Sequence, residues 1–163
     1  RSLVGSVMCI RDSSKMIIWG NHSPTMYPDF ENIICNGELG KNLINDMSWV
    51  NNEFLPIVQQ RGKAVIDSRG ASSATSAAKA ALDTVVACEN PTRPGECFSA
   101  AVITDGSYGL PDGIICGMPL MTTSDGNVEI VRDIALSEFA KEKIKISTNE
   151  LIEERSAVED LLK

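Results

Sequence analysis

The sequence predicts a single α+β domain in which an antiparallel sheet packs with long helices. Two long segments have apolar residues at the three- and four-residue spacings of helices, and three short β-type runs are separated by turn residues. The chain has 163 residues, of which 43% are hydrophobic and 23% are charged, as in one ordinary globular domain. A chain of this length can form a core without disulfides or a metal.

The first part of the chain predicts short strands joined by loops. The apolar run from Met16 to Trp19 is closed by Gly20 and Asn21, as expected of a buried strand that enters a turn. Two prolines exclude a helix from the segment that follows. Residues 33–38 then predict a strand that reaches a hairpin-type Asn-Gly turn.

Two long helices are expected in the middle of the chain. The first extends from Asp46 to Arg69, with a kink at Pro56 or Gly62, and Gly70 ends it. The second, over 72–86, begins with serines suited to cap a helix and continues with small side chains. Small side chains favour tight helix packing, and they also allow a ligand to come close.

The last part predicts a three-stranded antiparallel meander followed by two helices. The strands are expected over 98–103, 113–120 and 127–131, because Asp-Gly and Pro-Asp-Gly turns separate them. Ser137 starts a short helix, and a capping box over 147–150 starts a final one. The apolar face expected for the final helix consists of Leu151, Val158, Leu161 and Leu162.

Charge and cysteine content limit the partners of the chain. The 15 basic and 22 acidic residues give a net charge of -7, which disfavours nucleic acid and anionic membranes. The apolar runs are far shorter than the roughly 18 residues of a membrane span. The cysteines form no CxxC pair and have no zinc-like spacing to a histidine, so we expect free thiols and no metal site. They are Cys9, Cys35, Cys88, Cys97 and Cys116.

Residues 1–13 differ from the rest of the chain. They do not begin with Met, show no helical or strand period, and resemble the peptide LVGSxMCIRDS that results when a sequencing adapter is translated in frame. We therefore interpret 1–13 as a non-native segment and 14–163 as the domain itself. On this interpretation Cys9 is not native and the protein lacks its beginning.

The sequence contains one candidate catalytic residue. It has no GxSxG, GxxxxGK[ST], HExxH or GxGxxG motif, so serine esterases, P-loop proteins, zinc proteases and complete dinucleotide-binding domains have no support. His22, the only histidine, follows the first strand, where an imidazole would have a rigid mount for acid–base chemistry. Asp29 is the nearest carboxylate along the chain, but nothing in the sequence brings it to His22. A surface or structural role for His22 therefore stays open at this point.

Several strings of the sequence resemble one enzyme family. They are MIIWGNHS at 16–23, YPD at 27–29, QRG at 60–62, SSA at 72–74 with SAA at 76–78, and SYGLP at 107–111. In this order they are similar to the C-terminal half of malate dehydrogenases of the lactate/malate dehydrogenase superfamily, and most similar to the cytosolic type. The resemblance extends from about Lys15 to Lys163.

The resemblance implies a fold, a reaction and two site residues. The fold would be the C-terminal domain of the family, without its Rossmann half. His22 would take the hydroxyl proton of malate while hydride passes to NAD, and would return a proton to oxaloacetate in reverse. Ser73 would contact the dicarboxylate. A cytoplasmic homodimer with no nucleic-acid or membrane partner is expected.

Some family features are missing from the chain. These are the Rossmann half, the mobile loop with two substrate arginines, and the Asp-x-x-Arg segment that supplies the aspartate partner of the histidine. Arg1 lies roughly where the last arginine would fall, but its surroundings match the adapter string better, so it is given no role. The chain by itself is therefore expected to be inactive.

Three alternatives remain. The chain could be a non-catalytic remnant that serves only as a dimerisation module. It could be a lactate dehydrogenase, which the GNHS string disfavours. It could also be the NADP-dependent plastid malate dehydrogenase, which typically has a cysteine-bearing C-terminal extension, whereas this sequence stops at Leu162 and Lys163.

Overall fold

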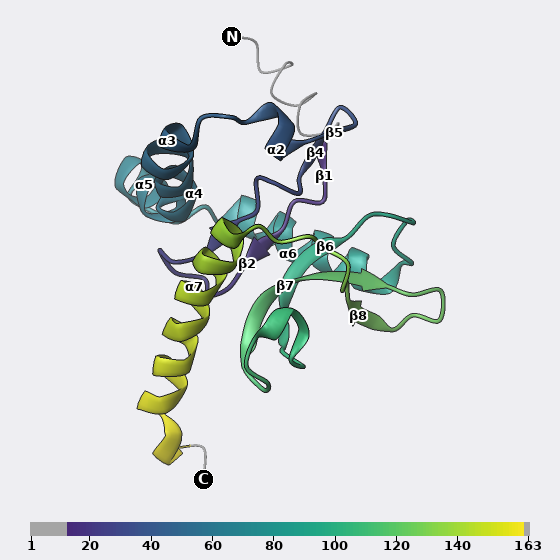
Figure 1. Cartoon of the computed structure of the whole chain (residues 1–163). Helices are drawn as coiled ribbons and strands as arrows, with labels where there is room; N and C mark the ends of the chain where they lie inside the picture. The colour runs from purple at the N-terminus through teal and green to yellow at the C-terminus, as the bar shows by residue number, and fades with distance from the viewer. Residues whose placement is uncertain (1–12, 162–163) are drawn as a thin grey trace.

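The computed structural model describes residues 13–161, which form short strands, a three-stranded sheet and several helices (Figure 1). The strands are β1 (Ser13–Ser14), β2 (Ile18–Trp19), β3 (Tyr27–Pro28), β4 (Ile34–Cys35), β5 (Glu38–Leu39), β6 (Phe98–Ile103), β7 (Ile115–Thr122) and β8 (Val128–Ile130). The α-helices are α2 (Gly40–Leu43), α3 (Met47–Trp49), α4 (Leu55–Gln59), α5 (Arg61–Arg69), α6 (Ala74–Glu89) and α7 (Glu138–Ala157). A π-helical turn, η1 (Val50–Phe54), and two 3-10 turns, η2 (Ser107–Gly109) and η3 (Glu159–Leu161), complete the set.

The three-stranded sheet is the antiparallel meander that the turns predict. Its order is β6-β7-β8, with Phe98 opposite Leu120 and Ile103 opposite Ile115. The middle strand covers 115–122, two residues later than expected, because Gly113 donates its N–H to Thr104 and is still part of the turn. Helices α6 and α7 both contact β7. The predicted α+β class is therefore confirmed.

The short strand β2 joins the N-terminal part of the domain to this sheet. Ile17 and Trp19 are fully buried while Met16 and Ile18 are exposed, which is the alternation of a strand with one face on the core. Strand β2 pairs with β3, and its next residue, Gly20, forms an isolated antiparallel bridge with Gly117 of β7. The predicted strand is therefore present, although it is shorter than 16–19 and is buried on one face only.

The hairpin and segment predictions near the N-terminus have separate outcomes. The β4–β5 hairpin turns at Asn36 and Gly37, both with positive φ, as the Asn-Gly pair predicts. The interpretation of 1–13 as non-native falls on residues outside the described part, as does Cys9. Ser13 alone of that segment is described, and it pairs with Cys35 in the β1–β4 ladder.

The first predicted long helix exists but is divided. Its turns continue from α3 through η1 and α4 to α5, and Gly70 ends it with a φ of 70°. Pro56 has no N–H and crowds the preceding turn, so the helix widens into the π-turn just before it. This agrees with the first of the two predicted kink positions, Pro56 or Gly62. A second interruption lies at Gln60, with φ -102° and ψ 8°.

The prediction of two C-terminal helices is wrong. One continuous helix, α7, begins after the cap at Ser137 and ends at Ala157. The serine and threonine read as a capping box lie inside this helix, and its buried face contains Ala140, Ile144, Ser147 and Thr148. Val158 and Leu161, placed on the apolar face from sequence, are exposed. Contacts with the rest of the domain, described below, satisfy the Ser147 hydroxyl without a helix start.

Helices α5 and α6 expose most of their surface. Neither has a buried residue, and Ile66, Leu82, Val85 and Val86 are exposed apolar side chains.

The four described cysteines are free thiols. Within 13–161, none of the helices combines the length and apolar content needed to cross a membrane.

Candidate active site around His22

His22 lies in the loop between β2 and β3, which we call the His22 loop (residues 20–26). Trp19, at the end of β2, is fully buried, and Gly20 exchanges two backbone hydrogen bonds with Gly117 of 3.2 and 2.8 Å. Ser99 of β6 accepts from the N–H of Ile18 and donates to its carbonyl, each at 3.0 Å. The strand that carries the loop is therefore fixed to the sheet on one side and to the core on the other.

His22 lines an open hollow of about 210 Å³. Its wall consists of uncharged side chains and glycine backbone, with His22 as its one titratable side chain. The lining residues are Ile18, Gly20, Asn21, His22, Met26, Ser99, Ala100, Ala101 and Gly117. His22 itself is exposed, and no hydrogen bond joins its ring to another described residue. The ring is thus free to meet a bound molecule in the hollow.

The residues beside His22 bind helix α7. The N–H of Asn21 donates to Ser147 Oγ at 2.7 Å, and the Asn21 side-chain amide donates to Glu154 at 2.8 Å. Ser23 Oγ and Thr25 Oγ1 both donate to Glu150 Oε2, each at 2.5 Å. These hydrogen bonds hold the pKa of the Glu150 carboxyl below its usual value, so it is ionised at neutral pH.

Asp29 does not serve as a partner for His22. Its carboxylate is buried and accepts hydrogen bonds from Trp19 Nε1 at 3.1 Å and from the Asn32 side chain at 2.9 Å. It also accepts from the backbone N–H groups of Glu31 and Asn32. This set of contacts fixes β2 to the turn after β3, and both carboxylate oxygens of Asp29 accept hydrogen bonds within it.

Ser73 occupies the N-cap position of α6 and is partly exposed. Its carbonyl accepts from the N–H of Ala77 at 3.0 Å and from Ser76 Oγ at 3.1 Å, while its side chain makes no capping hydrogen bond. Ser73 does not line the hollow beside His22. Its role as a substrate contact stays a prediction.

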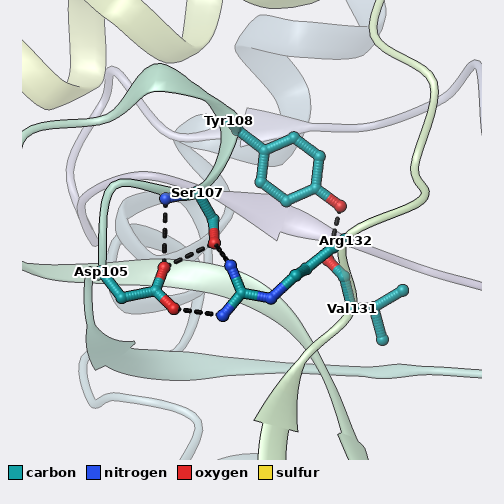
Figure 2. Close-up of polar contacts among 5 residues, drawn as sticks. All are labelled: Asp105, Ser107, Tyr108, Val131 and Arg132. Carbon is teal, nitrogen blue, oxygen red and sulfur yellow. Dashed lines mark hydrogen bonds and ion pairs between the residues drawn. The ribbon is translucent and has the colours of Figure 1, made fainter.

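The SYGLP string forms a separate, internally paired cluster (Figure 2). Arg132 donates to Asp105 Oδ2 at 2.5 Å and to the hydroxyl of Ser107, which itself donates to Asp105. Tyr108 donates its hydroxyl to the Val131 carbonyl at 2.5 Å, and its ring meets the Trp19 ring edge-on at 4.9 Å. The string therefore packs against Trp19 and is linked by hydrogen bonds to the segment that follows β8. Hydrogen bonds from Ser107 and Arg132 lower the pKa of Asp105 to about 2.

Sequence reasoning missed the three residues of α7 that hold the loop. The sequence pattern assigns Ser147 and Glu150 to a helix cap and gives no role to Glu154. A serine and two glutamates inside an acidic helix carry no local signal of contact with a loop more than a hundred residues earlier.

The arrangement of the sheet and helices is that of a known dehydrogenase domain. Residues 7–161 match the lactate/malate dehydrogenase, alpha/beta C-terminal domain, and the chain belongs to this family. It is similar to a malate dehydrogenase from Naegleria fowleri, with 42% identity and a TM-score of 0.85 over 98% of this chain and 48% of that one.

A second similar structure contains bound molecules. It is the lactate dehydrogenase of Trichomonas vaginalis in complex with NADH and oxamate, with 24% identity and a TM-score of 0.86 over 98% of this chain and 50% of that one. At this identity the likeness concerns the fold alone. The chain thus spans about half the length of the solved relatives it matches, and no Rossmann half is present among the described residues.

Proposed function

We propose that this chain is the substrate half of an NAD-dependent malate dehydrogenase, in which His22 exchanges a proton with malate and oxaloacetate. The observation that carries the proposal is the position of His22, just after a strand that is buried on one face and at the wall of a hollow lined by uncharged residues. The 42% identity to a malate dehydrogenase supports malate as the substrate.

The residues of the chain have a defined part in this reaction. The imidazole of His22, as a neutral base, accepts the proton of the malate 2-hydroxyl as the carbonyl forms. In the reverse direction the protonated ring donates that proton to the oxygen of oxaloacetate. Backbone hydrogen bonds of Gly20 and Asn21 hold the loop that carries the ring in place for both directions of the transfer. Ser73 is proposed as a contact for the dicarboxylate.

The site fits the reacting end of a nicotinamide cofactor. Part of the hollow is lined by glycine, alanine and serine, so a flat ring can lie against the backbone there. Its volume of about 210 Å³ is below the roughly 300 Å³ at which complete ligand pockets begin. NAD supplies the hydride acceptor when bound, and the rest of the cofactor would need residues of the whole protein outside this chain.

The proposal extends to assembly and location. The exposed apolar residues of α5 and α6 support burial of these helices in a homodimer of the whole enzyme. The similarity of the GNHS region to the cytosolic type supports a cytoplasmic location. The chain alone is proposed to be inactive, because it contains no complete nucleotide-binding motif.

The test joins the chain to the N-terminal half of the Naegleria fowleri malate dehydrogenase and follows NADH consumption. The joined protein should turn over oxaloacetate, the chain alone should show no turnover, and His22→Asn should lower kcat by about 100- to 10,000-fold. A folded, NADH-binding fusion without turnover, or with turnover that His22→Asn leaves unchanged, would favour the non-catalytic remnant.

The interpretation of residues 1–13 has its own test. Sequencing the source transcript upstream of Ser14 should show a continuous reading frame that encodes an Asp-x-x-Arg segment and a glycine-rich turn in place of the adapter-like string. A start codon near Arg1 would contradict this interpretation.

A further inference from the structure

Helix α7 presents three polar side chains to the His22 loop. Ser147, Glu150 and Glu154 are spaced by three and four residues, so they lie on one face of the helix. Each accepts a hydrogen bond from the loop, and together they form what we call the α7 clamp. In the view of Figure 1, helix α7 lies beside the three-stranded sheet, with its upper part near β2. The three residues lie in the middle and the second half of α7.

The α7 clamp forms hydrogen bonds with the neighbours of His22 and none with its ring. Asn21, on one side, is held through its backbone N–H by Ser147. Ser23, on the other side, is held through its hydroxyl by Glu150, and Thr25 donates to the same oxygen. Fixing the residue before and the residue after sets the Cα–Cβ direction of His22 without using either ring nitrogen. The ring keeps both nitrogens for a substrate and an orienting group.

The His22 loop and α7 are in close contact where Gly20 meets Ser147. Ser147 is fully buried, and a Cβ placed on Gly20 would lie 2.1 Å from Ser147 Oγ and 2.5 Å from its Cβ. Glycine is therefore required where the loop leaves β2, since the helix occupies the space of any side chain. The Ser147 hydroxyl also lies 3.0 Å from Thr25 Oγ1, which links the start of the loop to its end.

The carboxylates of the α7 clamp are suited to accept hydrogen bonds from hydroxyl and amide groups. An ionised carboxylate accepts hydrogen bonds and has no proton to donate, and hydrogen bonds to a charged acceptor are stronger than neutral ones. The hydroxyl donors from Ser23 and Thr25 converge on one oxygen of Glu150. Loss of this oxygen leaves two donors of the loop without their shared acceptor.

We propose that Ser147 and Glu150 of α7 are positioning residues that fix the orientation of the His22 loop for proton transfer. The fixing of the loop rests on the contacts alone, whereas its benefit to catalysis rests on the proposed function of His22. A general base acts well only when its ring is aligned with the proton it takes, so the effect belongs to kcat.

Nuclear magnetic resonance on the whole 163-residue chain tests the positioning directly, because its single histidine gives one identifiable ring signal. Glu150→Ala and Ser147→Ala should broaden or split this signal, and the amide order parameters of the loop should fall from about 0.85 to below about 0.6. Glu150→Gln, which keeps an acceptor oxygen, should restore most of the order. Glu153→Ala is the matched control, because Glu153 is an exposed glutamate of the same helix and makes no hydrogen bond to the loop.

The dispersed amide signals of β6 and β7 report whether each variant is folded. If Glu150→Ala unfolds the chain, Ser23→Ala and Thr25→Ala remove the same hydrogen bonds from the loop side and decide the test. Wild-type order parameters in folded clamp variants, or in both loop variants, would overturn the proposal. Loop disorder confined to the clamp and loop variants would support it.

Kinetics of the fused enzyme separate this proposal from the proposed function. Glu150→Ala should lower kcat by about tenfold through misalignment of His22, while KM for oxaloacetate changes much less. An inactive wild-type fusion together with loop disorder in Glu150→Ala would reject the proposed function and keep the clamp. An active fusion in which Glu150→Ala leaves both loop order and kcat unchanged would reject the clamp and keep the function.

Discussion

Replacement of Gly20 by alanine tests the close approach of α7 to the His22 loop. Gly20 has a φ of +91°, and its added Cβ would lie 2.1 Å from Ser147 Oγ and 2.5 Å from Ser147 Cβ. The positive φ should destabilise the variant by about 1–2 kcal/mol. The overlap with a buried side chain adds about 1–3 kcal/mol, because Ser147 has no free space into which to move.

The expected total is therefore a loss of about 2–5 kcal/mol in the free energy of unfolding. Urea unfolding followed by circular dichroism measures it. Gly37→Ala is the matched control, because Gly37 has a similar φ of +83° and nothing within 4 Å of the added Cβ. This control carries the backbone strain without the overlap, so the difference between the two variants isolates the contact with Ser147.

A second substitution checks that Ser147 is the cause. Ser147→Gly removes both atoms that overlap and leaves its Cα at 3.8 Å, an ordinary contact distance. In the Gly20→Ala background it should recover about 1–3 kcal/mol beyond the sum of the single effects. Gly20→Ala no more destabilising than Gly37→Ala, or a double variant that shows no such coupling, would refute the reasoning.

Two further predictions concern pH. Burial foremost, then the charges of Asp29 and Glu31, raise the pKa of Tyr27 above its ordinary 10.0. The contribution of the protonated Tyr27 side chain to the free energy of unfolding is therefore complete below pH 10, and it is lost as the pH rises beyond 10. Tyr27→Phe should therefore lose less stability than the wild type in urea unfolding between about pH 8 and pH 10.5, and equal losses would contradict this. Asp105 has its pKa lowered from 3.8 to about 2, so the stability it contributes is present above pH 3.8 and disappears as pH falls toward 2. Asp105→Asn should be less stable than the wild type at neutral pH, with the difference closing near pH 2; a difference that stays constant would show that the ion pair with Arg132 is not its source.

The sequence by itself determined the local elements and the family. Alternating burial at Ile17 and Trp19 follows from an apolar run in a strand, and the Asn36-Gly37 turn follows from the ease with which these residues adopt positive φ. The meander over β6, β7 and β8 follows from its turn residues. The strings around His22 are local too, and they are sufficient to identify the family that the fold confirms.

Only the tertiary structure decided what the residues of α7 do. A serine followed by a glutamate three positions later satisfies the pattern of a helix cap. The sequence does not show which hydrogen-bond donors lie close to these two side chains in the folded chain. In the folded chain, the N–H of Asn21 and the hydroxyls of Ser23 and Thr25 reach Ser147 and Glu150, so no cap is needed and the helix continues. Hydrogen-bond partners across a hundred residues depend on how the layers pack, and this is why the setting of His22 emerged from the fold and not from its motif.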